Sequence, residues 1–314
     1  MNDDREGARA SCDSSDRYRL HPNVIGGLWI LLSSVCFTAT SSLAKYLGAT
    51  YSAPTQTFFS QLAAMLLLLP YTLTHLGSVF RTQQRRTLIL RSGLSTIAVT
   101  LAYTSYHHLP LADANALSFT RSLWVLPLAA LLLGERMRAT VIVAGVVAFG
   151  GVLLIGGAIG TAERSFWGMA AGVTGAIVAA LTLVTVRGLT KQTSGAVLVV
   201  WSSLVGIFFS APLALVTGWE WPRVEHLWLI ALMGGCALAQ QVCYIKGLQI
   251  GEVSAIAPID NIRIVFAILV GTLVFHELPS LTTMSGIALI IGASMAILWS
   301  FAPRRDRAAE AASP

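Results

Sequence analysis

An all-α integral membrane protein with ten transmembrane helices, arranged as two inverted five-helix repeats, is the fold class that the sequence predicts. Three observations support this expectation: an apolar composition, apolar runs of membrane-spanning length, and an internal repeat. Of the 314 residues, 55% are hydrophobic and only 11% are charged, and the mean hydropathy is +0.69. Soluble domains carry about 25% charged residues, so this composition excludes an ordinary soluble protein.

Apolar runs separated by short polar breaks recur along the whole chain. A bilayer core of about 30 Å requires about 20 apolar residues for each helix, and the runs are continuous rather than alternating, which excludes membrane β-strands. The predicted spans cover residues 24–47, 55–75, 87–106, 112–133, 140–158, 167–187, 196–217, 226–246, 253–275 and 281–301. We expect the polar segments 1–23 and 302–314 to be solvated tails, and the first span to be a permanent helix rather than a cleaved signal peptide.

The distribution of positive charge predicts the orientation, because Lys and Arg stay on the cytoplasmic side during insertion. With the N-terminus inside, 16 of the 21 Lys and Arg residues fall in cytoplasmic segments, and Lys45, Arg164 and Arg223 fall on the opposite side. We therefore expect a multi-pass protein of the bacterial inner membrane, monomeric or homodimeric, with both termini cytoplasmic. The net charge of +6 then reflects contact with membrane lipids and not with nucleic acid. The four cysteines lack metal-ligand spacing, so neither a metal nor a cofactor is expected.

The chain matches itself at a shift of 142 residues. Gly26 aligns with Gly168, Lys45 with Arg187, Arg121 with Arg263 and Glu135 with Glu277. These matches define a first repeat over residues 24–158 and a second over 167–301. Each repeat holds five spans, and an odd number places the second copy upside down relative to the first. Inverted repeats are typical of secondary transporters, because exchanging the conformations of the two copies opens the protein to the other side.

Three segments resemble the EamA-type proteins of the drug/metabolite transporter superfamily. They are "GGLWILLSSVCFTATSSLAKYLG", "LSFTRSLWVLPLAALLLGERM" and "APIDNIRIVFAILVGTLVFHELP", and the resemblance extends from about Val24 to Phe301. It implies a ten-helix carrier with cytoplasmic termini, a central cavity between the repeats and small organic metabolites as substrates. Many relatives carry proline directly after the arginine of the fourth span, where this chain has Ser122. We therefore expect the kink in this helix to be moved, towards Pro127, or softened.

Two arginines lie near the predicted midplane of the membrane. At 1.5 Å rise per residue, Arg121 and Arg263 are both roughly 14 to 15 Å into a core of about 30 Å. A central arginine costs about 2.5 to 3.5 kcal/mol, so both should face protein or water. Asp260 lies three residues before Arg263, on the same helical face, where simple mutual neutralisation is one interpretation. The surplus positive charge favours an anionic or zwitterionic substrate, and Asp260 is also the candidate for proton coupling.

Other polar and aromatic side chains could line the same cavity. We consider Asn261, Gln240, Gln241, Tyr103, Tyr244, Asn115, Phe119, Trp124 and Thr38 as substrate-binding candidates, although such residues also bond or pack within helix bundles. Glu135 and Glu277 are interpreted as helix-end residues that bond to a neighbouring loop. The glycines expected to allow close helix approach are Gly168, Gly172, Gly145, Gly150, Gly286 and Gly292.

The leading functional hypothesis is a secondary active transporter of a small organic metabolite, working by alternating access, with proton coupling or exchange. An intramembrane lipid- or prenyl-transferring enzyme is the alternative. Such chemistry normally requires clustered carboxylates that bind magnesium, and the closely spaced Asp13 and Asp16 lie in a polar tail. A structural or receptor protein would not need two repeat-related arginines at the midplane.

Overall fold

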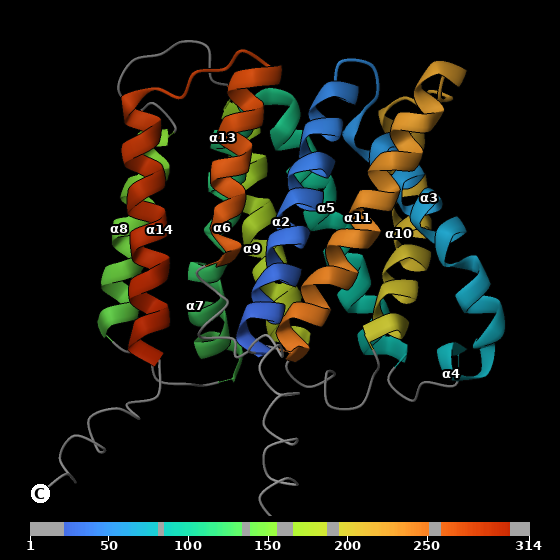
Figure 1. Cartoon of the computed structure of the whole chain (residues 1–314), viewed down its shortest axis with the longest axis horizontal. Coiled ribbons are helices and arrows are strands. Elements are labelled where there is room, and N and C mark those ends of the chain that lie inside the picture. The colour runs from blue at the N-terminus through green and yellow to red at the C-terminus, as the bar shows by residue number, and fades with distance from the viewer. Residues whose placement is uncertain are drawn as a thin grey trace, which may run out of the picture.

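The computed structural model describes residues 22–80, 85–133, 139–155, 166–186, 195–250 and 259–301, and in these ranges the regular elements are all helices. They are α2 (Pro22–Leu47), α3 (Ala53–Thr74), α4 (Leu76–Phe80), α5 (Arg85–His108), α6 (Leu111–Phe119), α7 (Arg121–Leu133), α8 (Ala139–Ile155), α9 (Phe166–Val186), α10 (Gly195–Thr217), α11 (Val224–Ile250), α13 (Ile262–Val274) and α14 (Leu281–Phe301). Figure 1 shows the long helices standing side by side in one bundle. The expected all-α architecture is confirmed for the described residues.

Five of these helices are long and apolar enough to cross a membrane: Val24–Leu47, Ala53–Thr74, Phe166–Thr185, Gly195–Thr217 and Val224–Ile250. The apolar parts of α8, α13 and α14 are shorter. α5 has the length, but it carries Arg85, Arg86 and Arg91 within its first two turns. We call the side of the bundle on which α2 ends the Lys45 side, and the opposite side, on which α5 begins, the Arg91 side (Figure 1).

The predicted fourth span is broken immediately before Arg121. α6 ends at Phe119, Thr120 forms a turn, and α7 begins at Arg121, so the interruption has not moved to Pro127, which lies inside α7. Hydroxyl groups explain the break without a proline at position 122. Thr120 Oγ1 donates to the carbonyl of Leu117 at 2.7 Å, and Ser122 Oγ donates to that of Phe119 at 2.8 Å. Such bonds compete with the helical pattern and favour bending.

The ninth predicted span has a similar turn, at Asn261, after which α13 begins. Residues 253–258 of this span lie outside the described residues. The two turns place Arg121 and Arg263 in the first turns of α7 and α13. Both arginines therefore stand beside an interrupted helix in the interior of the bundle.

Helices from the two halves of the chain pack against each other. α2 lies along α11, α5 along α9, α3 along α10, and α8 along α14. A Cβ atom on Gly168 would come within 2.7 Å of the His108 side chain, so α9 begins on the Lys45 side, where α2 ends. α2 and α9 therefore run in opposite directions.

One glycine pair brings α8 and α14 into close contact. A Cβ on Gly286 would lie 2.7 Å from the carbonyl oxygen of Gly151, and a Cβ on Gly151 would lie 2.8 Å from that of Gly286. Gly145, Gly150 and Gly292 have no such neighbour within 4 Å among the described atoms. Of the six glycines expected to allow close approach, Gly286 does so here with Gly151 as its partner. Gly168 and Gly172 of α9 do so as well, since an added Cβ would lie 2.7 Å from the His108 side chain and 2.9 Å from that of Leu117, respectively.

Candidate functional site

Arg263 is held in a fixed position in the interior of the bundle. It is 3% exposed, and its Nη2 atom lies 2.9 Å from Oδ2 of Asp260, one turn earlier in the chain. The guanidinium carbon lies 4.2 Å from the ring centroid of Phe119 and 4.8 Å from that of Phe37. A delocalised guanidinium stacks on aromatic faces more readily than an ammonium does. Two rings and one carboxylate therefore fix this cation.

Arg121 is held more loosely. Its Nη2 atom lies 3.9 Å from the same Oδ2 atom of Asp260, and its side chain is 31% exposed. Asp260 thus bridges the two arginines, with Arg263 as the closer partner. A pair separated by 3.9 Å is beyond hydrogen-bond distance, so Arg121 keeps donors for a further partner. The three side chains form what we call the arginine cluster, consisting of Arg121, Asp260 and Arg263.

The arginine cluster borders a cavity of about 290 Å³ inside the bundle, which we call the central cavity. Both arginines line it, together with Tyr106 of α5 and with Gln240, Gln241 and Tyr244 of α11. Small residues of α9, among them Gly172, Gly175, Ala176 and Ala179, leave the space open on one wall. The central cavity extends towards the Arg91 side, where Arg91, Ser95, Thr182 and Ser202 also line it.

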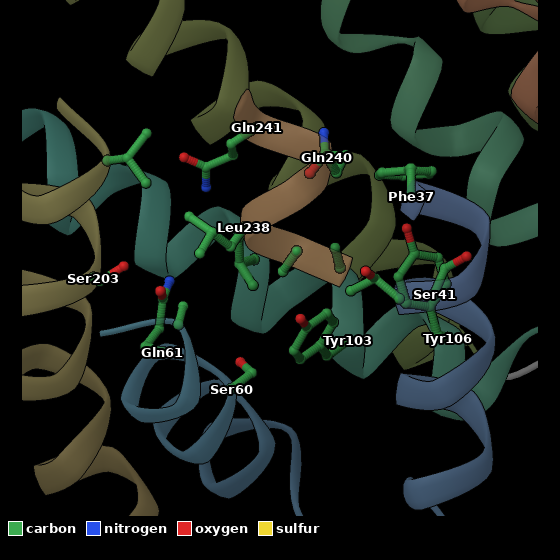
Figure 2. A pocket seen from close by; sticks show the side chains of 16 residues that line it. Phe37, Ser41, Ser60, Gln61, Tyr103, Tyr106, Ser203, Leu238, Gln240 and Gln241 are labelled. Atoms are coloured by element: carbon green, nitrogen blue, oxygen red, sulfur yellow. The ribbon is translucent and has the colours of Figure 1, made fainter. Parts of the chain in front are cut away.

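A smaller chamber of about 110 Å³ adjoins the central cavity, and Figure 2 shows it from close by. Ser60 and Gln61 come from α3, Tyr103 and Tyr106 from α5, and Ser203 from α10 (Figure 2). Phe37, Tyr106, Gln240 and Gln241 line both spaces, so the two are neighbours with a common wall. We call it the side chamber.

An ion pair joins three helices on the Lys45 side. Lys45, near the end of α2, pairs with Glu277, which follows α13, and Lys45 Nζ also donates to the carbonyl of Leu109 at 2.8 Å. The second oxygen of Glu277 accepts from the backbone N–H of Leu111, at the start of α6, at 2.9 Å. His276 has a φ of 55°, a left-handed conformation that is common where helices end and that turns the chain after α13.

Aromatic side chains also contact one another on the Lys45 side. Trp219, between α10 and α11, lies edge-on to Phe58 at 5.0 Å between ring centroids and 5.5 Å from Phe59. Tyr51 hydrogen-bonds through its hydroxyl to Nδ1 of His226 at 2.9 Å. Together with the Lys45–Glu277 pair, these contacts join α2, α3, α6 and α11 on this side.

The predicted site residues fall into two groups. Arg121, Arg263, Gln240, Gln241 and Tyr244 line the central cavity, and Tyr103 lines the side chamber. Phe119 and Asp260 contact Arg263 directly. Their roles in binding stay predictions.

The remaining candidates lie away from these two spaces. Asn115 is fully buried and donates to the carbonyl of Leu111 at 2.8 Å, and Thr38 donates to that of Ser34 at 3.0 Å. Asn261 points towards Met295 of α14, with Nδ2 at 3.5 Å from the sulfur. Trp124 lines a separate, mostly apolar space between α7 and α8. None of these four is among the residues that line the central cavity or the side chamber.

Several residues of the site were not singled out from the sequence. Phe37, Gln61, Ser203 and Arg91 line the two spaces, and Lys45 pairs with Glu277 across the repeats. One signal was present: Gln61 and Ser203 align at the repeat shift of 142. The sequence predicts that Glu277 is a helix-end residue, and the Leu111 N–H that donates to it agrees with this role, whereas the sequence does not predict its pairing with Lys45. Its repeat partner Glu135 lies outside the described residues.

Comparisons with known proteins agree with a transporter. The sequence profile of the EamA-like transporter family matches residues 24–157 and again residues 166–299. The chain is 25% identical to the S-adenosylmethionine uptake transporter of Rickettsia bellii over 88% of this chain and 94% of that protein. It is 27% identical to the pseudopaline exporter CntI of Pseudomonas aeruginosa, over 87% of this chain and 95% of that one.

A human protein and a solved structure are also similar. Solute carrier family 35 member G1 of Homo sapiens is 26% identical, over 86% of this chain and 78% of its own length. A crystal structure aligns with a TM-score of 0.60 at 20% identity, over 90% of this chain and 98% of that chain. At this identity the structural likeness supports the fold alone.

Proposed function

We propose that this chain, which belongs to the EamA-like transporter family, carries a small metabolite with a negatively charged group across a membrane by alternating access. Family membership makes it a multi-pass membrane transporter and not an enzyme, which sets aside the lipid- or prenyl-transferring alternative. Relatives are named for uptake of S-adenosylmethionine and for export of pseudopaline. A small organic molecule is the substrate class that these names have in common.

The ten-span, inverted-repeat topology is the framework of this proposal. It is supported by the double family match and by the opposite directions of α2 and α9. It is also supported by the helix pairs, since exchanging the repeats converts the α2–α11 pair into the α9–α5 pair. The boundaries 24–158 and 167–301 belong to the proposal. We also propose, from the distribution of positive charge, that the protein lies in the bacterial inner membrane with both termini in the cytoplasm.

Alternating access is supported by the unequal sizes of two repeat-related spaces. Thr40 and Ser60 line the side chamber, and their counterparts at a shift of 142, Thr182 and Ser202, line the central cavity. The side chamber measures about 110 Å³ and the central cavity about 290 Å³. If the two repeats exchange conformations, the small space widens and the large one narrows. In the proposed orientation the present state faces the cytoplasm, because the central cavity extends towards the Arg91 side while ion-pair and aromatic contacts join the helices on the Lys45 side.

The observation that carries the binding site is the difference between the two arginines. Arg263 is committed to Asp260 and to two aromatic rings, whereas Arg121 faces the cavity with donors to spare. A substrate carboxylate can therefore take the place of Asp260 beside Arg121, with two parallel hydrogen bonds, while Asp260 stays with Arg263. Arg121 is the binding residue in this scheme, and Arg263 positions Asp260.

Transport assays test this assignment directly. A thermal-shift screen of the purified protein against a metabolite library first identifies a ligand, since a molecule that binds the folded state raises its apparent stability. In proteoliposomes loaded with that ligand, Arg121→Ala should abolish flux. Arg223→Ala is the matched control, because Arg223 is an exposed residue that precedes α11 on the Lys45 side. Wild-type flux in the Arg121→Ala protein would refute the proposed site.

Asp260 is the proposed proton-coupling group, because a carboxylate between two arginines can exchange an ion pair for a proton. If it couples transport to protons, an imposed pH gradient will drive substrate flux in the wild type. Asp260→Asn should keep binding but lose that response. An unchanged response in the Asn variant would rule out the proton role.

A further inference from the structure

We propose that the side chamber is a second subsite, which binds an uncharged amide group of the substrate, either open-chain or within a ring. This inference rests on the proposed function, because it assumes that a carboxylate of the same molecule lies at Arg121. It assigns separate partners to two parts of one substrate. The charged part belongs to the arginine cluster, and the neutral polar part belongs to the side chamber.

The lining of the side chamber is polar but carries no charge. Its sixteen residues include three glutamines, four Ser or Thr hydroxyls and two tyrosines, and they include no Lys, Arg, Asp, Glu or His. An ionised group placed there would lose hydration without gaining a counter-ion. A neutral group that forms hydrogen bonds matches such a lining.

The hydroxyl groups and the amides of this lining differ in their availability. Thr40, Ser41 and Ser60 each donate to a carbonyl of their own helix, at 2.9 to 3.0 Å. The side-chain amides of Gln61, Gln240 and Gln241 form no hydrogen bond with any group in the described part of the chain. These three amides therefore present free donors and acceptors to whatever occupies the space.

The pairing chemistry of a carboxamide defines the ligand class. A glutamine side chain offers an N–H donor beside a carbonyl acceptor, and an amide offers the complementary acceptor and donor. Two hydrogen bonds can then form side by side. Gln61 comes from α3 and Gln241 from α11, so an amide between them would be contacted from two helices (Figure 2).

One molecule can occupy both spaces. Gln240, Gln241, Tyr106 and Phe37 belong to both walls, so the side chamber lies next to the cavity that the arginine cluster borders. A volume of about 110 Å³ is several times the roughly 10 to 15 Å³ that one water molecule needs on this measure. The chamber therefore has room for a small polar group and not for a whole metabolite.

Two matched probes separate an amide subsite from a chamber that holds only water. Succinamate carries a carboxylate and a primary amide, and 4-methylpentanoate replaces that amide by an apolar isopropyl group of similar size. Their dissociation constants are measured by calorimetry on the purified full-length protein. The variants are Gln61→Met, Gln241→Met and Arg121→Ala, with Gln249→Met, an exposed glutamine of α11, as the matched control.

The wild type should bind succinamate at least about fivefold more tightly than 4-methylpentanoate, the gain expected from one net hydrogen bond. The preference should vanish in Gln61→Met and Gln241→Met and persist in Gln249→Met. Equal affinity for the two probes in the wild type, absence of measurable binding of either, or a preference that survives in both chamber variants would overturn the subsite.

The Arg121→Ala variant distinguishes a failure of the amide subsite from a failure of the proposed carboxylate site. We expect this variant to bind neither succinamate nor 4-methylpentanoate. If both still bind with wild-type affinity, the carboxylate site at Arg121 is wrong, and the subsite falls with it. If both are lost while the wild type does not discriminate between them, the side chamber alone is wrong.

Discussion

We predict that the ion pair between Lys45 and Glu277 stabilises the state in which the Lys45 side is closed, relative to the state in which that side is open. Lys45→Met removes the cation and keeps the length of the side chain. It deletes the pair with Glu277 and the bond to the Leu109 carbonyl, while Glu277 keeps its bond from the Leu111 N–H. The Lys45 and Glu277 side chains are 14% and 27% exposed, so solvent screens the pair only in part.

The magnitude follows from these contacts. A hydrogen bond to a charged group contributes about 1.5 to 3 kcal/mol, and an exposed ion pair contributes at most about 1 kcal/mol. For a half-buried pair we take about 2 kcal/mol, which corresponds to a change of roughly 30-fold in an equilibrium constant. Because the pair is lost when the Lys45 side opens, Lys45→Met should lower the ratio of the closed population to the open population about 30-fold.

Cysteine labelling measures this ratio. Ser60→Cys places a thiol in the side chamber, in a background from which Cys12, Cys36, Cys236 and Cys243 have been removed. A membrane-impermeant maleimide added outside intact cells then reports the opening of the Lys45 side. The labelling rate should rise by an order of magnitude or more in Lys45→Met, within the roughly 30-fold limit.

Lys246→Met is the matched control, because Lys246 lies near the end of α11 on the Arg91 side, 4.8 Å from the ring centroid of Trp29. It should leave the external labelling rate unchanged. Equal labelling of the wild type and Lys45→Met would refute the assignment of this ion pair to the closed state. Faster labelling in both lysine variants would show that loss of any lysine loosens the bundle.

Three further outcomes follow from the geometry. Arg263→Met should lower the free energy of unfolding by about 3 kcal/mol, because it leaves a largely buried Asp260 without its close partner. Arg121→Met should lower it by less than about 1 kcal/mol, and thermal unfolding in detergent compares the two variants. Gly286→Val should cost about 2 kcal/mol by forcing α8 from α14, and Gly150→Val, with no described neighbour within 4 Å, should be nearly neutral in the same assay. Glu277→Gln keeps the shape and the acceptor for Leu111 but loses the charge, so external labelling at Ser60→Cys should rise less than in Lys45→Met.

The sequence was sufficient to predict a pair of repeat-related arginines and the acidic neighbour of one of them, but not the aromatic rings that further distinguish them. The repeat aligns Arg121 with Arg263, and their depth in the membrane stays a prediction from residue spacing. Their surroundings differ because Phe37, on α2, reaches Arg263, and because Asp260 has the non-acidic Ser118 as its counterpart. Which ring covers which cation depends on the packing of helices far apart in the sequence, and a single chain gives no direct sign of that packing.

Polar residues inside helices were the least predictable group. Asn115 and Thr38 satisfy their own backbone, as Ser and Thr often do in membrane helices, while Gln240 and Gln241 face open space. Residue type cannot separate these cases, because Thr40 and Ser60 also donate to a carbonyl of their own helix and still line the side chamber. The adjacent position of Gln240 and Gln241 was informative, since two neighbouring amides point in different directions and cannot both serve one helix contact.

The break in the fourth span shows how local chemistry can replace an expected residue. Relatives with proline after the arginine suggested that a chain with Ser122 would bend elsewhere, yet the interruption lies at Thr120, immediately before Arg121. Ser118, Thr120 and Ser122 each donate to a carbonyl three residues earlier, at 2.7 to 2.8 Å, and three such bonds in succession divert the carbonyls from the helical pattern. We therefore attribute the break before Arg121 to these three hydroxyl groups, which take the place of a proline at position 122.

Replacing Ser118, Thr120 and Ser122 by Ala should restore a continuous helix, draw Arg121 away from Asp260 and weaken ligand binding. Ser122→Pro should preserve both the break and ligand binding. Binding in the triple variant that matches the wild type would show that the break is not needed to orient Arg121.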